Sequence, residues 1–164
     1  LSFFHYFTAM FKKRISIFQV EEGNFLSPKF GTKGLIPVVT TDNKSGDVLM
    51  HGYMNKIALK KTIETKEAHY WSRSRKALWH KGKTSGFVQK VVELRIDDDQ
   101  DAIWLKVNIG KGASCHVGYI SCFYRSIPLG KIKNLNKIKI KFKEKKKKFD
   151  PNKVYKGQPN PTKL

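Results

Sequence analysis

An acidic run at residues 97–101 carries side chains suited to binding a divalent cation. It reads Asp-Asp-Asp-Gln-Asp, with apolar text on both sides. Successive side chains of a strand alternate between its faces, so a regular strand would point Asp97, Asp99 and Asp101 one way and Asp98 the other. Three carboxylates on one face repel each other unless a cation neutralises them, and Mg²⁺ prefers such oxygen ligands. The alternative is a solvated acidic turn.

Both cysteines follow shortly afterwards, with a histidine beside the first. Cys115 and Cys122 offer soft thiolate ligands of the kind that bind zinc, and His116 is adjacent. They do not form a CxxC pair. Two thiols buried in a core therefore explain the residues as well as a metal site does.

A polar, basic segment at residues 71–86 carries groups that recognise phosphate. Arginine guanidinium groups match phosphate oxygens, and glycine lets backbone N–H groups approach an anion. Tyr70, Trp71 and Trp79 offer aromatic faces on which a base can stack. The alternative is a solvated basic loop anchored by two tryptophans.

The elements that must position these groups indicate a mainly β (α+β) domain with one short helix. Asn55 is an N-cap candidate for that helix, which we expect to end near Lys66. Alternating apolar residues and turn signals predict five to seven strands. The expected strands cover residues 35–41 and 48–54 as a hairpin, then 68–72, 87–96, 102–107 and the Cys-His block at 114–125.

Length and charge divide the chain into one domain and two extensions. Its 164 residues carry a formal net charge of +20, and residues 131–164 hold 13 lysines against two acids. We expect an N-terminal extension at 1–33, partly disordered over 1–9, and a domain at 34–130. Residues 131–164 are predicted to be a lysine-rich tail that binds nucleic acid only nonspecifically. Within it, the alternation at 137–143 is compatible with an edge strand that has a lysine face, and the part from Lys145 on is expected to be solvated.

The cysteine count and the hydropathy suggest where the protein works. Two cysteines are too few for a disulfide framework, which favours a reduced, cytoplasmic setting. The apolar stretch before Phe11 is too short to span a bilayer, so no membrane association is expected.

The two blocks together resemble the phosphoribosyl-AMP cyclohydrolase family. The likeness covers residues 35–125 and is dense and collinear. It rests on His-Tyr-Trp-Ser-Arg-Ser-Arg at 69–75, Lys-Gly at 81–82, Thr-Ser-Gly at 84–86, Cys-His-Val-Gly at 115–118 and Ser-Cys-Phe-Tyr-Arg at 121–125, with shorter matches at 52–55, 78–79 and 89–91.

The resemblance implies an activity and an assembly. The activity is hydrolytic opening of the adenine ring of phosphoribosyl-AMP, between N1 and C6, in histidine biosynthesis. The family fold is a mainly β chain in an intertwined homodimer, with zinc at the subunit interface and Mg²⁺ nearby. We expect the likeness to end after Pro128.

One position departs from the family pattern. The family usually reads Asp-Cys-Asp-x-Asp at the acidic run, and that cysteine is the third zinc ligand. Here the position holds Asp98. Because a carboxylate oxygen is an acceptable zinc ligand, we expect Asp98 to join Cys115 and Cys122 at zinc, while Asp97, Asp99 and Asp101 hold Mg²⁺.

The resemblance also suggests roles for the remaining site residues. Zinc with three protein ligands leaves a position for a water of lowered pKa, and His116 is the candidate general base or proton shuttle. Its alternative is a histidine of the core. The candidate substrate-binding residues are Trp71, Arg73, Ser74, Arg75, Lys81, Thr84 and Ser85.

Two other functions are compatible with parts of the sequence. A basic RNA-binding β module would explain the charge and the interleaved aromatic residues, but it gives the acidic and Cys-His blocks no role. A cyclohydrolase relic without zinc would explain Asp98. Metal analysis and a substrate assay distinguish these alternatives.

Overall fold

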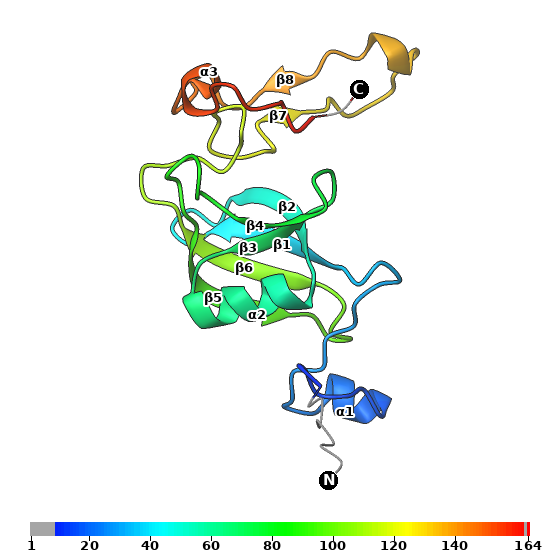
Figure 1. The fold of residues 1–164 in the computed structure, drawn as a ribbon. Helices are drawn as coiled ribbons and strands as arrows, with labels where there is room; N and C mark the ends of the chain where they lie inside the picture. The colour runs from blue at the N-terminus through cyan, green and yellow to red at the C-terminus, as the bar shows by residue number, and fades with distance from the viewer. Residues whose placement is uncertain (1–8, 163) are drawn as a thin grey trace.

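A four-stranded sheet forms the centre of the computed structural model, which describes residues 9–162 and 164 (Figure 1). Within this part the elements are α1 (Ile17–Glu21), β1 (Ile36–Asp42), β2 (Val48–Met54), α2 (Lys56–Thr65), β3 (His69–Ser72), β4 (Ala77–His80), β5 (Lys90–Ile96), β6 (Ile103–Asn108), β7 (Arg125–Ser126), the 3-10 helix η1 (Leu135–Lys137), β8 (Lys141–Phe142) and α3 (Pro151–Val154). The mainly β prediction is confirmed.

The sheet has the order β2-β1-β6-β5. β1 pairs antiparallel with β2 and parallel with β6, and β5 pairs antiparallel with β6. β1 and β2 form the expected hairpin, whose turn is closed by Asp42 Oδ2 accepting the Ser45 N–H at 2.9 Å. The hairpin ends at Asn55, whose side chain accepts the Ala58 N–H at 2.8 Å and begins α2. Lys66, at φ 57°, ends that helix in the left-handed conformation.

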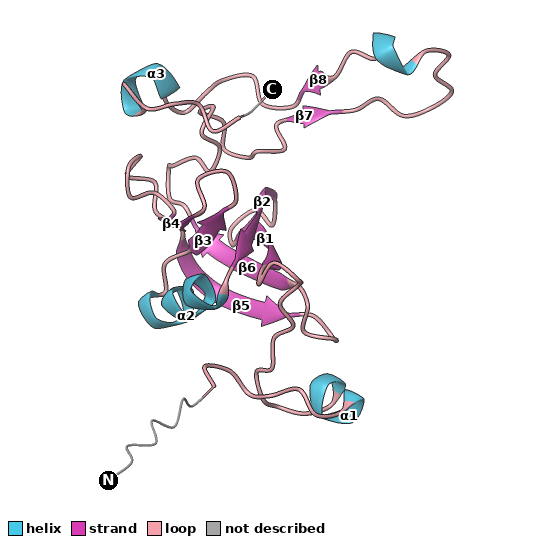
Figure 2. Ribbon diagram, turned by 45° about the vertical axis from the view of Figure 1, so that its right-hand side comes forward, coloured by secondary structure: helices cyan, strands magenta, loops and turns pink. Residues whose placement is uncertain are grey.

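A second layer of β3, β4 and α2 lies across one face of the sheet (Figure 2). Tyr70 of β3 is 1% exposed and packs over β2, where a Cβ on Gly52 would lie 3.0 Å from the Tyr70 ring. The core between the layers is aliphatic, which gives the fold its main stabilisation. Its fully buried members include Ile36, Val38, Leu49, Met54, Leu59, Leu105 and Val107.

The N-terminal extension is hydrogen-bonded to the turn between β5 and β6 through the side chain of Gln100. The Gln100 side chain accepts the Ser27 N–H at 2.7 Å and donates to the Val20 carbonyl at 3.0 Å. The segment includes α1, which the sequence did not predict. The disorder expected for residues 1–9 lies almost entirely outside the described residues.

Residues 131–162 are largely exposed and include the strand β8 within the expected edge-strand segment 137–143, but the part from Lys145 on packs on the domain rather than extending into solvent. They run back over the end of the domain remote from α1, where β8 pairs with β7 and α3 follows (Figure 1). The segment contacts the loop that carries the cysteines: the Lys148 N–H donates to the Gly118 carbonyl at 2.7 Å.

Four further expectations about local structure are wrong. Residues 97–101 form the turn between β5 and β6 rather than part of a strand, because Gln100 adopts φ 58°. Residues 114–124 form turns and bends, so only Arg125 of the Cys-His block is in a strand. The segment at 71–86, read as a loop, contains β4, and β5 begins at Lys90 rather than at 87. No helix in the described ranges is long and apolar enough to cross a membrane.

Candidate active site

The two cysteines lie together on one loop, residues 114–122, which we call the cysteine loop. Cys115 is buried, Cys122 is exposed, and both thiols are free. The Cys122 thiol hydrogen-bonds Cys115 and, with the Val117 N–H and the nearby Lys81 ammonium, lowers the pKa of Cys115 to about 7. The same hydrogen bond raises the pKa of Cys122. The pair therefore loses its first proton readily, as a thiolate metal ligand must.

Lys81 lies in the interior beside this pair, with 3% of its surface exposed. Burial lowers the pKa of Lys81, while attraction to Cys122 and Cys115 acts in the opposite direction. Its ammonium also lies 5.3 Å from the centre of the Trp79 ring. Of the basic residues predicted to bind phosphate, Lys81 is therefore the one placed next to the thiols.

His116 belongs to the cysteine loop and lies near Asn160 of the C-terminal segment. Its Nε2 is buried and has no hydrogen-bond partner among the described residues. Burial lowers the pKa of His116, and a hydrogen bond with the Asn160 side chain partly offsets this. The buried Nε2 is therefore a ring nitrogen of the cysteine loop that no described residue occupies.

A buried hydrogen-bond network supports the cysteine loop from the core. The Tyr70 hydroxyl lies 2.6 Å from Thr40 Oγ1 and donates to Gln89 Oε1 at 2.7 Å. Gln89 Nε2 in turn donates to Ser114 Oγ at 2.9 Å, next to Cys115. Burial raises the pKa of Tyr70, which keeps its hydroxyl a donor. Sequence reasoning assigned no role to Gln89 or Ser114, because nothing local marks this long-range network.

The β3–β4 hairpin presents most of the other predicted substrate residues at the surface. The Arg73 guanidinium lies 4.2 Å from the centre of the Tyr53 ring, and that of Arg75 lies 5.4 Å from the Trp79 ring. Arg75 also donates to Ser72 Oγ at 3.2 Å. Ser74 and Thr84 are exposed, whereas Trp71 and Ser85 are half-buried.

A hollow of about 320 Å³ lies on the same hairpin against α2. It is lined by Lys61, His69, Leu78, His80 and Lys83. The two histidine rings are stacked, with centroids 4.3 Å apart. Glu67 holds both, because its carbonyl accepts from His69 Nδ1 at 2.8 Å and its carboxylate lies 2.8 Å from His80 Nε2.

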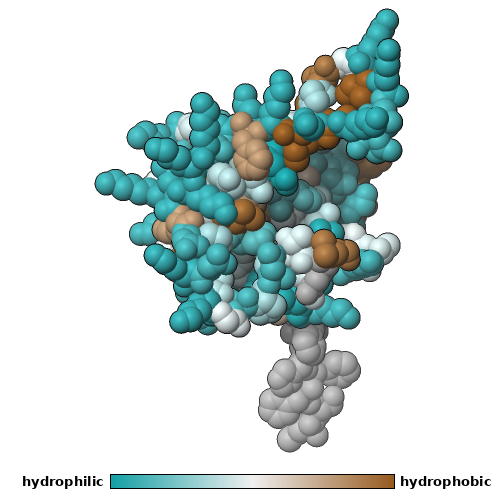
Figure 3. All heavy atoms as spheres, turned by 90° about the horizontal axis from the view of Figure 1, so that it is seen from above, coloured by the Kyte–Doolittle hydropathy of each residue, from teal (hydrophilic) through white to brown (hydrophobic). Residues whose placement is uncertain are grey.

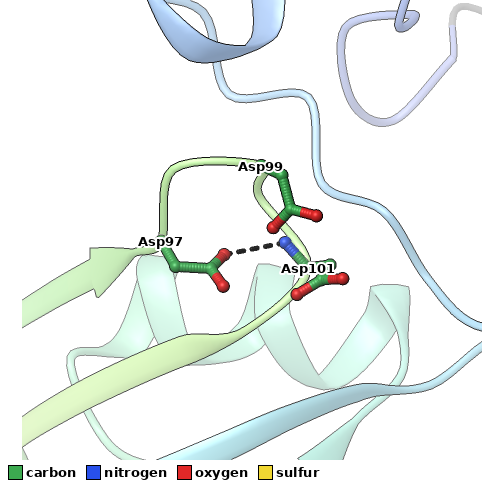
Figure 4. A group of neighbouring side chains, drawn as sticks. All are labelled: Asp97, Asp99 and Asp101. Carbon is green, nitrogen blue, oxygen red and sulfur yellow. Dashed lines mark hydrogen bonds between the residues drawn. The ribbon is translucent and has the colours of Figure 1, made fainter.

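The acidic trio converges even though it lies in a turn (Figure 4). Asp97, Asp99 and Asp101 each offer a carboxylate oxygen within 4.8 Å of the others. Asp97 Oδ1 accepts the N–H groups of Asp101 at 2.8 Å and Ala102 at 2.9 Å, which closes the turn. Loss of hydration, followed by the neighbouring Asp99 and Asp97, raises the pKa of Asp101. This oxygen-rich cluster fits a hard divalent cation.

Asp98 is separated from the thiols within one chain. It is exposed in the turn before β6, whereas the cysteine loop follows the end of β6, a strand about 20 Å long at the usual rise per residue. Among the described residues only the acidic trio forms a cluster of three metal-ligating side chains. The two thiols are ligands of the kind that zinc prefers, but Asp98 of the same chain does not lie beside them.

Known proteins resemble this chain over most of its length. A family model described as phosphoribosyl-AMP cyclohydrolase matches residues 50–124. A protein of that name from Rhodopseudomonas palustris is 54% identical over 136 residues, covering 83% of this chain and 88% of the relative. One from Nitrobacter winogradskyi is 49% identical over 140 residues (85% and 94%), and one from Brucella canis is 57% identical over 109 residues (66% and 78%). The longer matches exceed residues 34–130, so the likeness extends into the flanking segments, contrary to the expectation that it ends after Pro128.

Proposed function

The chain belongs to the phosphoribosyl-AMP cyclohydrolase family, and we propose that it carries out that reaction at a metal centre shared between two subunits. It is a hydrolase of histidine biosynthesis that opens the adenine ring of phosphoribosyl-AMP between N1 and C6. The observation that carries the active-site assignment is the pair of free thiols on one loop beside buried Lys81.

Cys115 and Cys122 would hold zinc together with Asp98 of the partner subunit. The thiols supply two soft ligands, and a carboxylate is an acceptable third. Zinc bound there would lower the pKa of a water molecule and so provide the nucleophile. The Lys81 ammonium beside the thiols would help keep them deprotonated.

His116 is the proposed proton acceptor in this reaction. Water that adds to C6 of the ring must lose a proton, and N1 must gain one as the C6–N1 bond breaks. The Nε2 of His116 is buried on the cysteine loop and has no hydrogen-bond partner among the described residues, so this ring nitrogen is available for proton transfer. We propose that His116 takes up the first proton and delivers the second.

Substrate phosphates are assigned to the β3–β4 hairpin and magnesium to the acidic trio. Arg73 and Arg75 are exposed guanidinium groups on a hairpin rich in hydroxyls. Asp97, Asp99 and Asp101 would hold Mg²⁺, whose charge would help to neutralise phosphate.

The separation of the proposed ligands and the apolar surface support a homodimer, which we propose as the active assembly. Several large apolar side chains on and near β7 and β8 are exposed to solvent in the single chain, as expected for a surface that a second subunit covers. They are Phe123, Ile127, Leu129, Leu135 and Phe142. Viewed from this end, hydrophobic patches interrupt a largely hydrophilic surface (Figure 3). The free thiols fit a reducing compartment, so we propose a cytoplasmic enzyme.

The test is conversion of phosphoribosyl-AMP, followed optically before and after a chelator and after return of Zn²⁺ or Mg²⁺ alone. We expect activity to be lost with the metals and to return only with zinc present. Cys115→Ser should abolish both activity and bound zinc. Full activity in chelated protein, or in Cys115→Ser, would refute the metal centre.

A further inference from the structure

The C-terminal segment from 141 to 160, which we call the strap, packs on the cysteine loop. Lys143 N–H donates to the Tyr124 carbonyl at 2.8 Å, on the C-terminal side of the loop. Gly118 lies so close to the strap that a Cβ there would be 2.5 Å from the Phe149 carbonyl oxygen. The Phe142 ring lies 6.1 Å from that of Tyr119. The backbones of the cysteine loop and the strap are therefore in close contact, and we call this contact the seam.

Glu144 makes the most specific contact across this seam. One carboxylate oxygen accepts the Ile120 N–H and the other accepts the Ser121 N–H, each at 2.8 Å. Hydrogen bonds to an ionised acceptor are the strong ones, and two at once fix the direction of the loop. Across residues 9–162 no lysine lies within salt-bridge distance of Glu144, although the strap is rich in lysine.

The other side of the loop is fixed by β2. The Cys122 N–H donates to the Leu49 carbonyl at 2.7 Å, and Ser121 Oγ donates to that of Val48 at 2.7 Å. Ser121, directly before Cys122, is therefore held by β2 through its side chain and by Glu144 through its backbone. Without Glu144 two half-buried N–H groups lose their acceptor, and the part of the loop next to Cys122 is held by β2 alone.

We propose that Glu144 is a positioning residue of the active site: its carboxylate orients the cysteine loop so that both thiols can bind one metal ion. Groups that orient metal ligands typically change metal affinity by about 10–100-fold when they are removed. The proposal rests on the proposed zinc centre for its metal readout. The strap then contributes to the chemistry although it lies beyond the residues matched by the family model, 50–124.

The test compares Glu144→Gln with the wild type and with Glu64→Gln, an exposed helix position paired with Lys60. A carboxamide keeps the size of the side chain but offers one acceptor oxygen instead of two. In Glu144→Gln we expect amide exchange of Ile120 and Ser121 to quicken about tenfold or more, while Val38 and Leu105 in the core stay protected. Glu64→Gln should match the wild type.

Metal binding gives the second readout. We expect Zn²⁺ affinity of Glu144→Gln, measured with a competing chelator, to fall at least about tenfold. Excess Zn²⁺ should restore kcat in this variant but not in Cys115→Ser. Unchanged exchange at Ile120 and Ser121, or unchanged Zn²⁺ affinity, would overturn the proposal, as would a general loss of core protection. If the wild type binds no zinc, the proposed metal centre fails, and the exchange rates still decide whether Glu144 orders the loop.

Discussion

Asp98 and Cys115 lie beyond opposite ends of β6, one in the turn that precedes the strand and the other on the loop that follows it. A centre that uses both must therefore take them from different chains. A two-fold symmetric dimer supplies this arrangement twice, since each chain gives its thiols to one centre and its carboxylate to the other.

The first prediction is that inactive variants complement each other. Cys115→Ser and Asp98→Asn should each be inactive as homodimers. When the two are co-expressed or reassociated, each heterodimer has one intact centre, and random pairing should recover about a quarter of wild-type activity. Activity of the separately purified variants and of the mixture is the measurement.

The control for complementation is a mixture of Cys115→Ser with Cys122→Ser. Each substitution damages the cysteine loop of its own chain, so every heterodimer carries two damaged loops and no intact centre, and this pair should recover no activity if both thiols of a centre come from one chain. If the mixture of Cys115→Ser with Asp98→Asn recovers no more activity than this control, Asp98 does not complete the partner's centre, and the shared arrangement is refuted.

The second prediction separates the two proposed metals. Asp99→Asn should weaken the Mg²⁺ dependence of turnover and leave bound zinc nearly unchanged, whereas Asp98→Asn should lose zinc and activity together. Asp99 is the better probe than Asp97, whose Oδ1 also closes the turn by accepting two N–H groups. Zinc content and Mg²⁺ titration of both variants are compared. Equal loss of both metals in both variants would mean that the carboxylates form one shared site.

Local signals predicted the β1–β2 hairpin and the start of α2 correctly. The turn with Gly46 and the Asn55 cap act over a few residues, so the sequence contains the information. The grouping of Asp97, Asp99 and Asp101 was also predicted, but from the alternation of a strand. The trio instead converges through the positive φ of Gln100 and the Asp97 side chain, which alternation does not encode.

Contacts between distant residues account for what the sequence did not reveal. β4 forms because Trp79 pairs with Tyr70 across the β3–β4 hairpin, although the segment reads as polar and basic. Glu144 sits in a lysine-rich run and meets Ser121 only after the chain turns back through β7 and β8. Such pairings depend on the assembled fold, and no pattern within either segment indicates them.

The third prediction concerns the network beneath the cysteine loop. Tyr70→Phe removes the hydroxyl that donates to Gln89 and contacts Thr40, leaving buried polar groups without a partner. We expect the free energy of unfolding to fall by about 1–3 kcal/mol, measured by urea denaturation. Tyr53→Phe is the matched control, because no hydrogen bond to the Tyr53 side chain is seen in the described part of the chain. A similar loss in both variants would argue against the network.

The fourth prediction is an acid-sensitive contribution from His69. Burial, followed by nearby His80 and Lys61, lowers the pKa of His69 below 6.5, while the bond to the Glu67 carbonyl offsets part of this. The unfolded chain then binds the proton more tightly than the folded one, so stability is full above pH 6.5 and falls as the pH drops below it. His69→Asn should flatten this slope in urea denaturation across the range, whereas exposed His51→Asn should not. An unchanged slope in His69→Asn would remove His69 as its source.

The last prediction tests the seam between loop and strap at Gly118. Its φ of +103° disfavours any side chain, and a Cβ would also meet the Phe149 carbonyl oxygen at 2.5 Å. Gly130 has φ +125° with nothing within 4 Å, so Gly130→Ala carries the backbone strain without the clash. We expect Gly130→Ala to lower the free energy of unfolding by about 1–2 kcal/mol, and Gly118→Ala to lower it further and to release the strap. Release is read from faster amide exchange at Lys148, whose N–H bonds the Gly118 carbonyl. If both variants lose the same free energy of unfolding and the Lys148 amide stays protected from exchange, the strap does not pack closely against the cysteine loop in solution.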